Sequence, residues 1–325
     1  MKGFQDRFAD LPDYILKMTR EIWEDRGLAT LHHYYAPGIA VRTPSGVSMG
    51  NLATLDATLA TLAEFPDREL LGEDVIWSGD EDAGFLSSHR LVSSGTHTGH
   101  GAFGPPTGRR FTVRVIADCS AKADVIDDEW LIRDAGGIVR QLGMEPESFA
   151  RDQILAEGGP ERARPPFTPA MDVQGPYVSR GNEGEWGLRL ADILTRIMEK
   201  DFTVIRADYD RAVRTEHPGA LGGWSWGFAE TQWMRLRSSF PTATFRVHHV
   251  IGRSDPHQPH RAAVRWSLDG RHSGPGSFGR PTGAPVHVMG ITHAEFGPWG
   301  LRREFTLWDE VAIWKQIHLH TGLHE

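Results

Sequence analysis

Apolar positions along the chain follow a helical spacing at first and a strand-like spacing later. The first run, which recurs every three or four residues and predicts a helix, consists of Leu11, Tyr14, Ile15, Met18 and Ile22. Two further helices are expected over residues 28–35 and 52–62. Turn residues then separate predicted strands over residues 75–77, 85–98, 111–119 and 125–133. This order predicts an α+β unit, with three helices on one face of a curved antiparallel sheet.

The chain contains one long segment twice. Residues 65–141 overlie residues 240–316 at a constant offset of 175, with no gap and 21 identical positions in 77. A constant offset over this length indicates two copies of one fold, and two copies are too few for a solenoid. We therefore predict a first domain over residues 1–143, a Pro/Gly-rich surface linker over 144–185 and a second domain over 186–325. Before residue 65 the register is expected to shift by a few residues.

Composition and charge narrow the function classes. Of 325 residues, 39% are hydrophobic and 24% are charged, which is typical of a globular protein. The net charge of −8 argues against nucleic acid as a partner, because that binding depends on basic side chains. A lone Cys119 excludes an internal disulfide. No apolar run approaches membrane-spanning length and no signal-peptide core is seen, so we expect a cytoplasmic protein without a membrane partner.

Neither a metal site nor a nucleotide site is expected. Most of the 16 histidines lie in the second half, but their spacing matches no H-E-x-x-H or comparable ligand pattern. The glycines of residues 99–104 imitate a G-x-G-x-x-G fingerprint. They lie between predicted strands with no helix after them, so the geometry that cradles a phosphate is missing.

Short motifs of the first copy resemble those of a known family. They are GTHTG at 95–99, FGPPTGRR at 103–110, Glu129-Trp130, Asp134 and RQLG at 140–143. This series resembles the SnoaL-like polyketide cyclases of the nuclear transport factor 2 (NTF2)-like superfamily, over nearly all of residues 11–143 and, more weakly, 188–317. The resemblance implies two tandem cone-shaped domains, each a curved sheet wrapped around three helices with an apolar pocket inside.

The resemblance also implies an activity. Family cyclases use no metal or cofactor, and a carboxylate removes a proton from the carbon next to a carbonyl so that a ring closes by an aldol step. Such a carboxylate needs an apolar cavity, because desolvation raises its pKa toward the working pH. The family's catalytic aspartate falls at Leu131 and Thr306, and its partner histidine at Ala117 and Thr292. Both copies lack the pair, so cyclisation by the family's own residues is not expected.

Two glutamates are the best acid/base candidates. Glu129 and Glu304 precede the vacated aspartate position by two residues, and strand alternation places residues i and i+2 on one face. His97, just before a glycine in a turn, is a third catalytic candidate. The alternative is structural: the glutamates pair with Arg90 and Arg265, which both copies retain, and the histidine bonds a neighbouring strand.

Other residues receive supporting roles. The candidates for substrate binding are Tyr35, Arg90 and Trp130 in the first copy and Tyr209, Arg265 and His272 in the second. Asp134 and Asp309 follow the last predicted strand, where we expect them to accept backbone N–H groups of a turn. The 11 tryptophans are expected to line either a pocket or the contact between the copies.

Two functions stay open at this point. The leading hypothesis is a cofactor-independent enzyme that uses Glu129 as a base on a small, partly apolar carbonyl compound, in an aldol cyclisation, isomerisation or elimination. The alternative is a non-catalytic module that binds a small molecule or a partner protein. An open cavity with an unpaired carboxylate of raised pKa favours the enzyme, whereas glutamates bonded to arginines favour the binder.

The duplication also predicts how the copies are arranged. Single-domain relatives commonly pair through their sheets, so we expect the two copies to pack on each other as an internal pseudo-dimer. The linker over residues 144–185 has ample reach for this arrangement. Whether the chain also forms a homodimer is left open.

Overall fold

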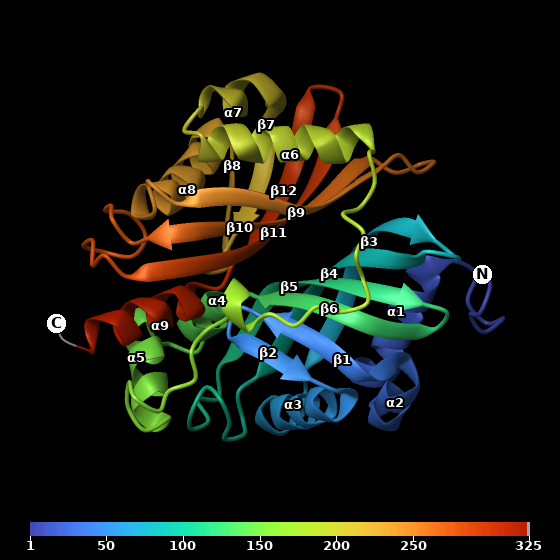
Figure 1. The fold of residues 1–325 in the computed structure, drawn as a ribbon, viewed down its shortest axis with the longest axis horizontal. Helices are drawn as coiled ribbons and strands as arrows, with labels where there is room; N and C mark the ends of the chain where they lie inside the picture. The colour runs from blue at the N-terminus through green and yellow to red at the C-terminus, as the bar shows by residue number, and fades with distance from the viewer. Residues whose placement is uncertain (324–325) are drawn as a thin grey trace.

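Each copy folds into a six-stranded sheet with helices on one face (Figure 1). The computed structural model describes residues 1–323. The strands of the first unit are β1 (Tyr35–Thr43), β2 (Gly46–Met49), β3 (Glu69–Asp80), β4 (Gly84–Thr96), β5 (Arg110–Lys122) and β6 (Val125–Arg133). Those of the second unit are β7 (Tyr209–His217), β8 (Leu221–Trp224), β9 (Thr244–Arg253), β10 (His260–Arg271), β11 (Pro285–Gly297) and β12 (Gly300–Leu307). The strand orders, β2-β1-β6-β5-β4-β3 and β8-β7-β12-β11-β10-β9, correspond position by position.

Helices cover the side of each sheet that faces away from the other unit (Figure 1). The first unit and the segment after it contain α1 (Leu11–Thr19), η1 (Arg20–Glu24), η2 (Leu28–Thr30), α2 (Leu31–Tyr34), α3 (Asn51–Glu64), α4 (Ala135–Gln141), α5 (Pro146–Ala156) and η3 (Pro169–Met171). The later helices are α6 (Glu185–Met198), α7 (Thr203–Asp208), α8 (Trp226–Ser239) and α9 (Glu310–Thr321). The first helix begins at Leu11 because the Asp10 carboxylate accepts the backbone N–H of Asp13.

The expected fold class, two tandem α+β domains, is confirmed. The sheets are mixed rather than antiparallel, because β1 runs parallel to β6 and β7 runs parallel to β12. The helix expected over residues 28–35 ends at Tyr34, and the chain continues directly into β1. Periodicity does not reveal this pairing, because the two partner strands lie far apart in the sequence.

The register of the repeat extends further back than expected. The offset of 175 persists through α3 and α8 and through β2 and β8, and it becomes 174 between β1 and β7. The expected shift of a few residues is therefore a single residue, in the turn before β8. Gly219 and Ala220 of that turn donate backbone N–H groups to Asp134 of the first unit, both at 2.7 Å. The altered turn thus bonds the two units to each other.

The two sheets pack face to face in the middle of the molecule (Figure 1). Apolar side chains on the outer faces of both sheets meet in two clusters, which contain Ile76, Leu86, Ile116, Ile132, Ile251, Ala263, Met289, Ile291 and Leu307. Each sheet is thus buried on both faces, by its own helices and by the other sheet. This is the arrangement of an internal pseudo-dimer.

A buried ion pair crosses the contact between the sheets. Asp118 of β5 lies 3.1 Å from the Arg265 guanidinium of β10, and both side chains are buried. Burial raises the pKa of the Asp118 carboxyl, and the nearby Arg265 works against that rise. The guanidinium also lies 3.6 Å above the ring of Trp130.

The segment between the two sheets is more ordered in its contacts than the expected surface linker. It begins with α5, whose Phe149 and Ala150 pack with Val311 of α9. Further on, Phe167 enters one of the clusters between the sheets, and Tyr177 makes a 2.7 Å hydrogen bond to His249. The Pro-rich composition concealed this short helix. No helix within residues 1–323 is both long enough and apolar enough to span a membrane.

Removing the cation of the buried pair is expected to destabilise the fold. Arg265→Ala leaves the Asp118 carboxylate buried without its ion-pair partner, which costs about 3–5 kcal/mol of unfolding free energy. Arg246→Ala is the control, because its guanidinium pairs with Asp269 in a largely exposed position. Equilibrium urea unfolding measures both variants. Equal losses in the two variants would contradict the structural role of the pair.

Candidate active site in the first unit

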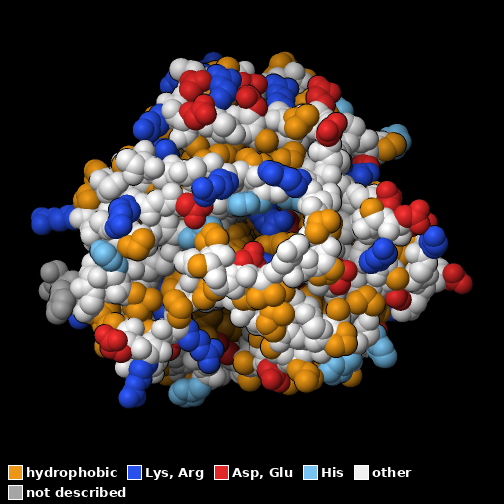
Figure 2. Space-filling view, in the orientation of Figure 1, with side chains coloured by type: hydrophobic (Ala, Val, Ile, Leu, Met, Phe, Trp, Pro, Cys, Tyr) orange, Lys and Arg blue, Asp and Glu red, His pale blue; other side chains and the backbone are white. Residues whose placement is uncertain are grey.

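A cavity of about 600 Å³ lies between the helices and the sheet of the first unit. Successive side chains of a strand point to opposite faces, so alternate residues of β6 enter it: Glu129, Leu131 and Arg133. Apolar residues from α1 and the sheet, such as Ile15 and Val115, form much of its wall. Figure 2 shows this face of the molecule hollowed within the first unit and also where the two units meet, with apolar side chains around both hollows.

Glu129 places a carboxylate in this cavity. It pairs with Val41 of β1 and Cys119 of β5, and all three side chains line the wall. The side chain is 5% exposed, and its Oε2 has no hydrogen-bond partner. Burial raises the pKa of the Glu129 carboxyl to about 7, although hydrogen bonding by Tyr35 works against the rise. A carboxyl with this pKa exchanges protons readily at neutral pH.

An imidazole lies one row along the sheet from Glu129. His89 of β4 pairs with Ala117 of β5, which pairs with Leu131 of β6, and all three line the cavity. Burial lowers the pKa of His89 to about 3, so the ring is neutral, and its Nε2 has no hydrogen-bond partner. The family resemblance places a catalytic histidine and aspartate at Ala117 and Leu131. Both positions hold apolar side chains in this chain, and His89 lies beside them on β4.

His89 was missed at the sequence level in favour of its neighbour Arg90, which is retained in both copies. Nearly every residue of β4 is buried, so the strand shows no alternation of apolar and polar residues. The pairing of β4 with β5 is the observation that identifies His89 as facing inward.

Two arginines line the same cavity. Arg68, between α3 and β3, donates from Nε to Ser93 Oγ at 3.2 Å, and Arg133 lies at the end of β6. Burial and the neighbouring Arg133 lower the pKa of Arg68 to about 9, which leaves it protonated at neutral pH. Arg133 is an exposed residue; desolvation along the cavity wall lowers the pKa of its guanidinium, and Glu129 opposes that change.

A second cavity of about 470 Å³ adjoins the first. The two share wall residues that include Arg68, Leu131 and Arg133. Phe149 of α5 and Lys315 of α9 also line the second cavity. The second unit and the segment between the sheets therefore help to enclose the space next to Glu129.

The other predicted arginines lie on the outer face of the sheets. Arg90 contacts Glu73 at 3.1 Å and Glu295 of the second unit at 3.2 Å, and it lies 3.7 Å above the Phe305 ring. Arg265 pairs with Asp118, as described above. These two arginines hold the units together and do not line the cavity of Glu129.

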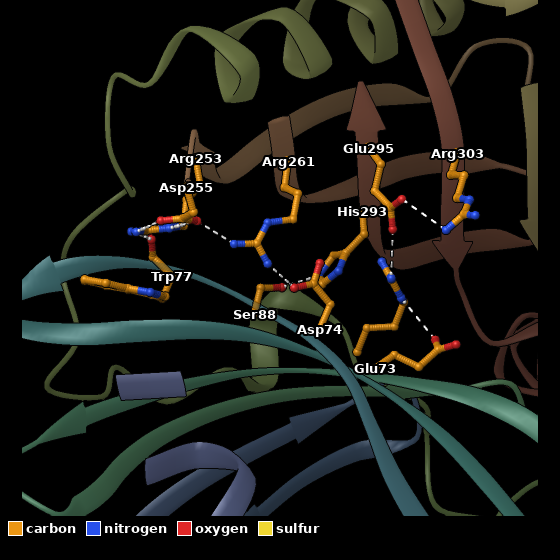
Figure 3. Close-up of polar contacts among 11 residues, drawn as sticks. Glu73, Asp74, Trp77, Ser88, Arg253, Asp255, Arg261, His293, Glu295 and Arg303 are labelled. Carbon is orange, nitrogen blue, oxygen red and sulfur yellow. Dashed lines mark hydrogen bonds and ion pairs between the residues drawn. The ribbon is translucent and has the colours of Figure 1, made fainter. Parts of the chain in front are cut away.

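Figure 3 shows polar contacts between residues of the two sheets. Ser88 of β4 lies 2.7 Å from Nε2 of His293, and its hydroxyl donates to Asp118 at 2.5 Å. This Ser, His and Asp group is not a nucleophilic triad: the serine proton goes to the aspartate rather than to the imidazole, and all three side chains are buried between the sheets. Arg261 beside it bridges Asp74 of β3 and Asp255 of the second unit.

The two predicted histidines are buried in equivalent loops. His97 Nδ1 lies 3.2 Å from Thr107 Oγ1, and its Nε2 lies 3.3 Å from Glu64. His272 Nδ1 lies 3.1 Å from Thr282 Oγ1. Neither histidine lines the cavity of Glu129, and both tie the ends of a loop together.

The remaining predicted residues divide between the cavity and the scaffold. Tyr35 lines the cavity, whereas the Trp130 ring lies on the outer face between the guanidinium groups of Arg42 and Arg265. Asp134 caps α4 by accepting the N–H of Gly137, and Asp309 caps α9 by accepting those of Val311 and Ala312. Within residues 1–323, no group of three or more His, Cys, Asp or Glu side chains is arranged to hold a metal ion.

The sequence of the first unit matches that of a known family. The family model for SnoaL-like polyketide cyclases covers residues 14–142, which include Glu129 and most of the residues that line its cavity. The first unit is a SnoaL-like domain. The comparison with curated proteins found no match. Because the second unit repeats the strand order of the SnoaL-like domain, the chain holds two tandem domains of this architecture.

Several solved structures are similar to about two fifths of the chain. IdmH, a polyketide cyclase candidate from Streptomyces antibioticus, is 27% identical with a TM-score of 0.36, over 41% of this chain and 98% of that one. A SnoaL-like polyketide cyclase candidate from Jannaschia sp. CCS1 is 16% identical with a TM-score of 0.36, over 42% and 96%. A polyketide cyclase candidate from Acidithiobacillus ferrooxidans is 20% identical with a TM-score of 0.35, over 40% and 92%.

Tryptophans occupy the corresponding interior of the second unit. Trp233, Trp266 and Trp308 stand 175 residues after Thr58, Leu91 and Arg133, which line the cavity of the SnoaL-like domain. Their ring centroids lie 6.0–6.2 Å apart, and all three rings are buried. Large side chains thus fill the space that is open in the first unit.

Glu304 therefore differs from Glu129 in its surroundings. Its Oε2 accepts the Tyr209 hydroxyl at 2.6 Å, and its Oε1 accepts the Thr306 hydroxyl at 2.7 Å. The side chain is fully buried in the core, and burial raises the pKa of its carboxyl. Glu304 is a hydrogen-bonded core residue, whereas Glu129 faces an open cavity.

The raised pKa of Glu129 predicts a specific pH dependence of stability in the SnoaL-like domain. The carboxyl titrates at about 7 when folded and at about 4.5 when unfolded, so the folded state binds more protons between these pH values. Stability is therefore lost as the pH rises from about 4.5 to about 7, by up to roughly 3 kcal/mol. Glu129→Gln should reduce the wild-type loss by this amount, because Asp134 and Asp309, whose pKa values burial also raises, still contribute, whereas Glu199→Gln on the exposed surface should retain the whole loss. Urea unfolding of each protein at pH 4.5 and 8 measures this loss of stability. An equal loss in Glu129→Gln and in the wild type would contradict the raised pKa of the Glu129 carboxyl.

Proposed function

We propose that the cavity of the first unit is an acid/base active site for a small, partly apolar carbonyl compound. The observation that carries this proposal is the Glu129 carboxylate, which faces an open cavity without an ion-pair partner and has a pKa of about 7. These are the surroundings that favour an enzyme over a binding module. Cyclisation, isomerisation and elimination all begin with the same proton transfer.

The residues around Glu129 suit that first step. In its ionised form Glu129 takes a proton from the carbon next to the carbonyl, and negative charge develops on the carbonyl oxygen. Burial raises the pKa of Tyr35 well above its usual range, so its hydroxyl keeps its proton. That hydroxyl bonds Glu129 in the free protein, and it can donate to the carbonyl oxygen once Glu129 has taken up the substrate proton. The neutral His89 ring is a second donor on the cavity wall. The fate of the enolate then depends on the substrate.

A non-catalytic binding role is the second candidate function. It is favoured by Ala117 and Leu131, which line the cavity where the family resemblance implies a histidine and an aspartate. A binder and an enzyme differ in turnover, so the two are separated by a measurement of proton exchange rather than of affinity.

Replacing Glu129 is expected to abolish exchange at carbon. The assay follows deuterium uptake from D2O next to the carbonyl of a panel of aryl ketones by NMR, with wild-type protein. Glu129→Gln should lower the catalysed rate about 100-fold or more, because a positioned base contributes at least this factor. Glu304→Gln is the matched control in the second unit and should retain the rate. Wild-type exchange by Glu129→Gln would refute the assignment, and no catalysed exchange of any ketone by the wild type would favour the binder.

A further inference from the structure

Arginine is usually paired with a carboxylate where it is buried in this chain. The buried guanidinium groups that pair in this way are those of Arg42, Arg90, Arg261 and Arg265. Arg237 instead donates to the backbone carbonyls of Phe240 and Ala243. Arg68 departs from the pattern: it is 7% exposed, and the one hydrogen bond of its guanidinium in the described residues is to the Ser93 hydroxyl.

Arg133 adds a second positive charge near that of Arg68. It lines the same two cavities as Arg68, and its side chain makes no hydrogen bond or ion pair within residues 1–323. The two guanidinium groups are close enough for the charge of Arg133 to act on Arg68. Arg68 is buried, and Arg133, an exposed residue at the end of β6, lines the same two cavities, so two positive charges face one space and the arrangement favours an anion that enters it.

Acidic side chains near the shared wall are already engaged. Glu64 accepts the backbone N–H groups of Ala102 and Phe103, and Glu157 pairs with Lys315. Asp309 accepts two N–H groups of α9. Glu129 acts on Arg133 electrostatically but makes no direct contact with it, and its raised pKa shows that the arginine does not hold it ionised. Within residues 1–323, Arg68 and Arg133 therefore lack a carboxylate that pairs with them.

We propose that Arg68 and Arg133 bind an anionic group of the substrate, a carboxylate or a phosphate, while the apolar body of that substrate lies toward Glu129. This proposal rests on the proposed function in one respect, because it takes the ligand of the cavity to be the substrate on which Glu129 acts. Arginine N–H groups suit both anions, because two of them can donate in parallel to two oxygens. The substrate class is thus an amphipathic carbonyl compound with one negatively charged end.

The spacing along β6 supports this orientation. Glu129 and Arg133 are four residues apart on the inward face, which separates their Cα atoms by about 13 Å. Leu131 lies between them and offers an apolar surface to the body of the substrate. Keeping the anion at the arginines also keeps its charge away from the Glu129 carboxylate, which would otherwise be harder to ionise.

The second unit supplies an internal comparison. The positions 175 residues after Arg68 and Arg133 hold Ala243 and Trp308, so neither cation is present there. Both of these residues belong to the closed core of that unit. The arginines thus occur where the interior is open and are absent where it is filled.

Calorimetry with three related probes tests the proposal. Naphthalene-2-carboxylate and 2-naphthyl phosphate carry the two anions, and naphthalene-2-carboxamide is their neutral counterpart. The wild type at pH 8 and low salt should bind at least one anion 10-fold or more tighter than the amide, and the tighter anion identifies the source. Arg68→Met and Arg133→Met, which keep an unbranched stem but remove the guanidinium, should each remove most of this preference. Arg246→Met, an exposed arginine of the second unit, is the control and should retain it.

The outcomes separate this proposal from the proposed function. Three results would each overturn it. The first is equal affinity for anion and amide, and the second is no binding of either anion at millimolar concentration. The third is a preference that survives in Arg68→Met/Arg133→Met. Thermal unfolding confirms that the variants are folded, which is expected because each removes an unpaired cation. Glu129→Gln should retain the anion preference while losing exchange at carbon, so loss of one property without the other shows which proposal fails.

Discussion

Alternation along the strands of the first sheet is the constraint on which the rest of the structure depends. On β6 the side chains of Glu129, Leu131 and Arg133 point into the cavity, whereas Trp130 and Ile132 point toward the second unit. A shift of one residue in register would exchange these two sets, placing the acid and the cation between the sheets and the apolar contact surface in the cavity. The duplication stabilises this register, because the second sheet requires an apolar outer face to pack against.

The two copies have the same strand order and different interiors. In the first, Thr58 and Leu91 leave room for a cavity beside Glu129; in the second, Trp233 and Trp266 at the matching positions close it. The closed unit still contributes to the site, because Lys315 of its last helix lines the adjoining cavity. The duplicated domain thus has one unit with a candidate site and one that supports and encloses it.

The sequence was sufficient to predict the α+β class and the tandem repeat, because these follow from a fixed offset and from period-two alternation. For Glu129 it left two alternatives, the pocket or an arginine across the sheet, and the structure places this side chain on the cavity wall. The sequence misplaced several of the supporting residues, although Tyr35 lines the cavity. Arg90 and Trp130 were expected at a pocket, but they belong to the contact between the sheets. In strands buried on both faces, polarity does not distinguish inside from outside, so His89 could not be told from Arg90 without the strand pairing. Arg68 was missed because it lies in no motif.

The central claim is that Glu129 is a desolvated, unpaired carboxyl in an open cavity. A ¹³C NMR titration of the glutamate side-chain carboxyl carbons tests it most directly, with the Glu129 signal assigned by its absence from Glu129→Gln. The structure predicts that this signal titrates with a pKa of about 7. A Glu129 signal that titrates at or below about 4.5, the usual range of an exposed glutamate, would contradict the account.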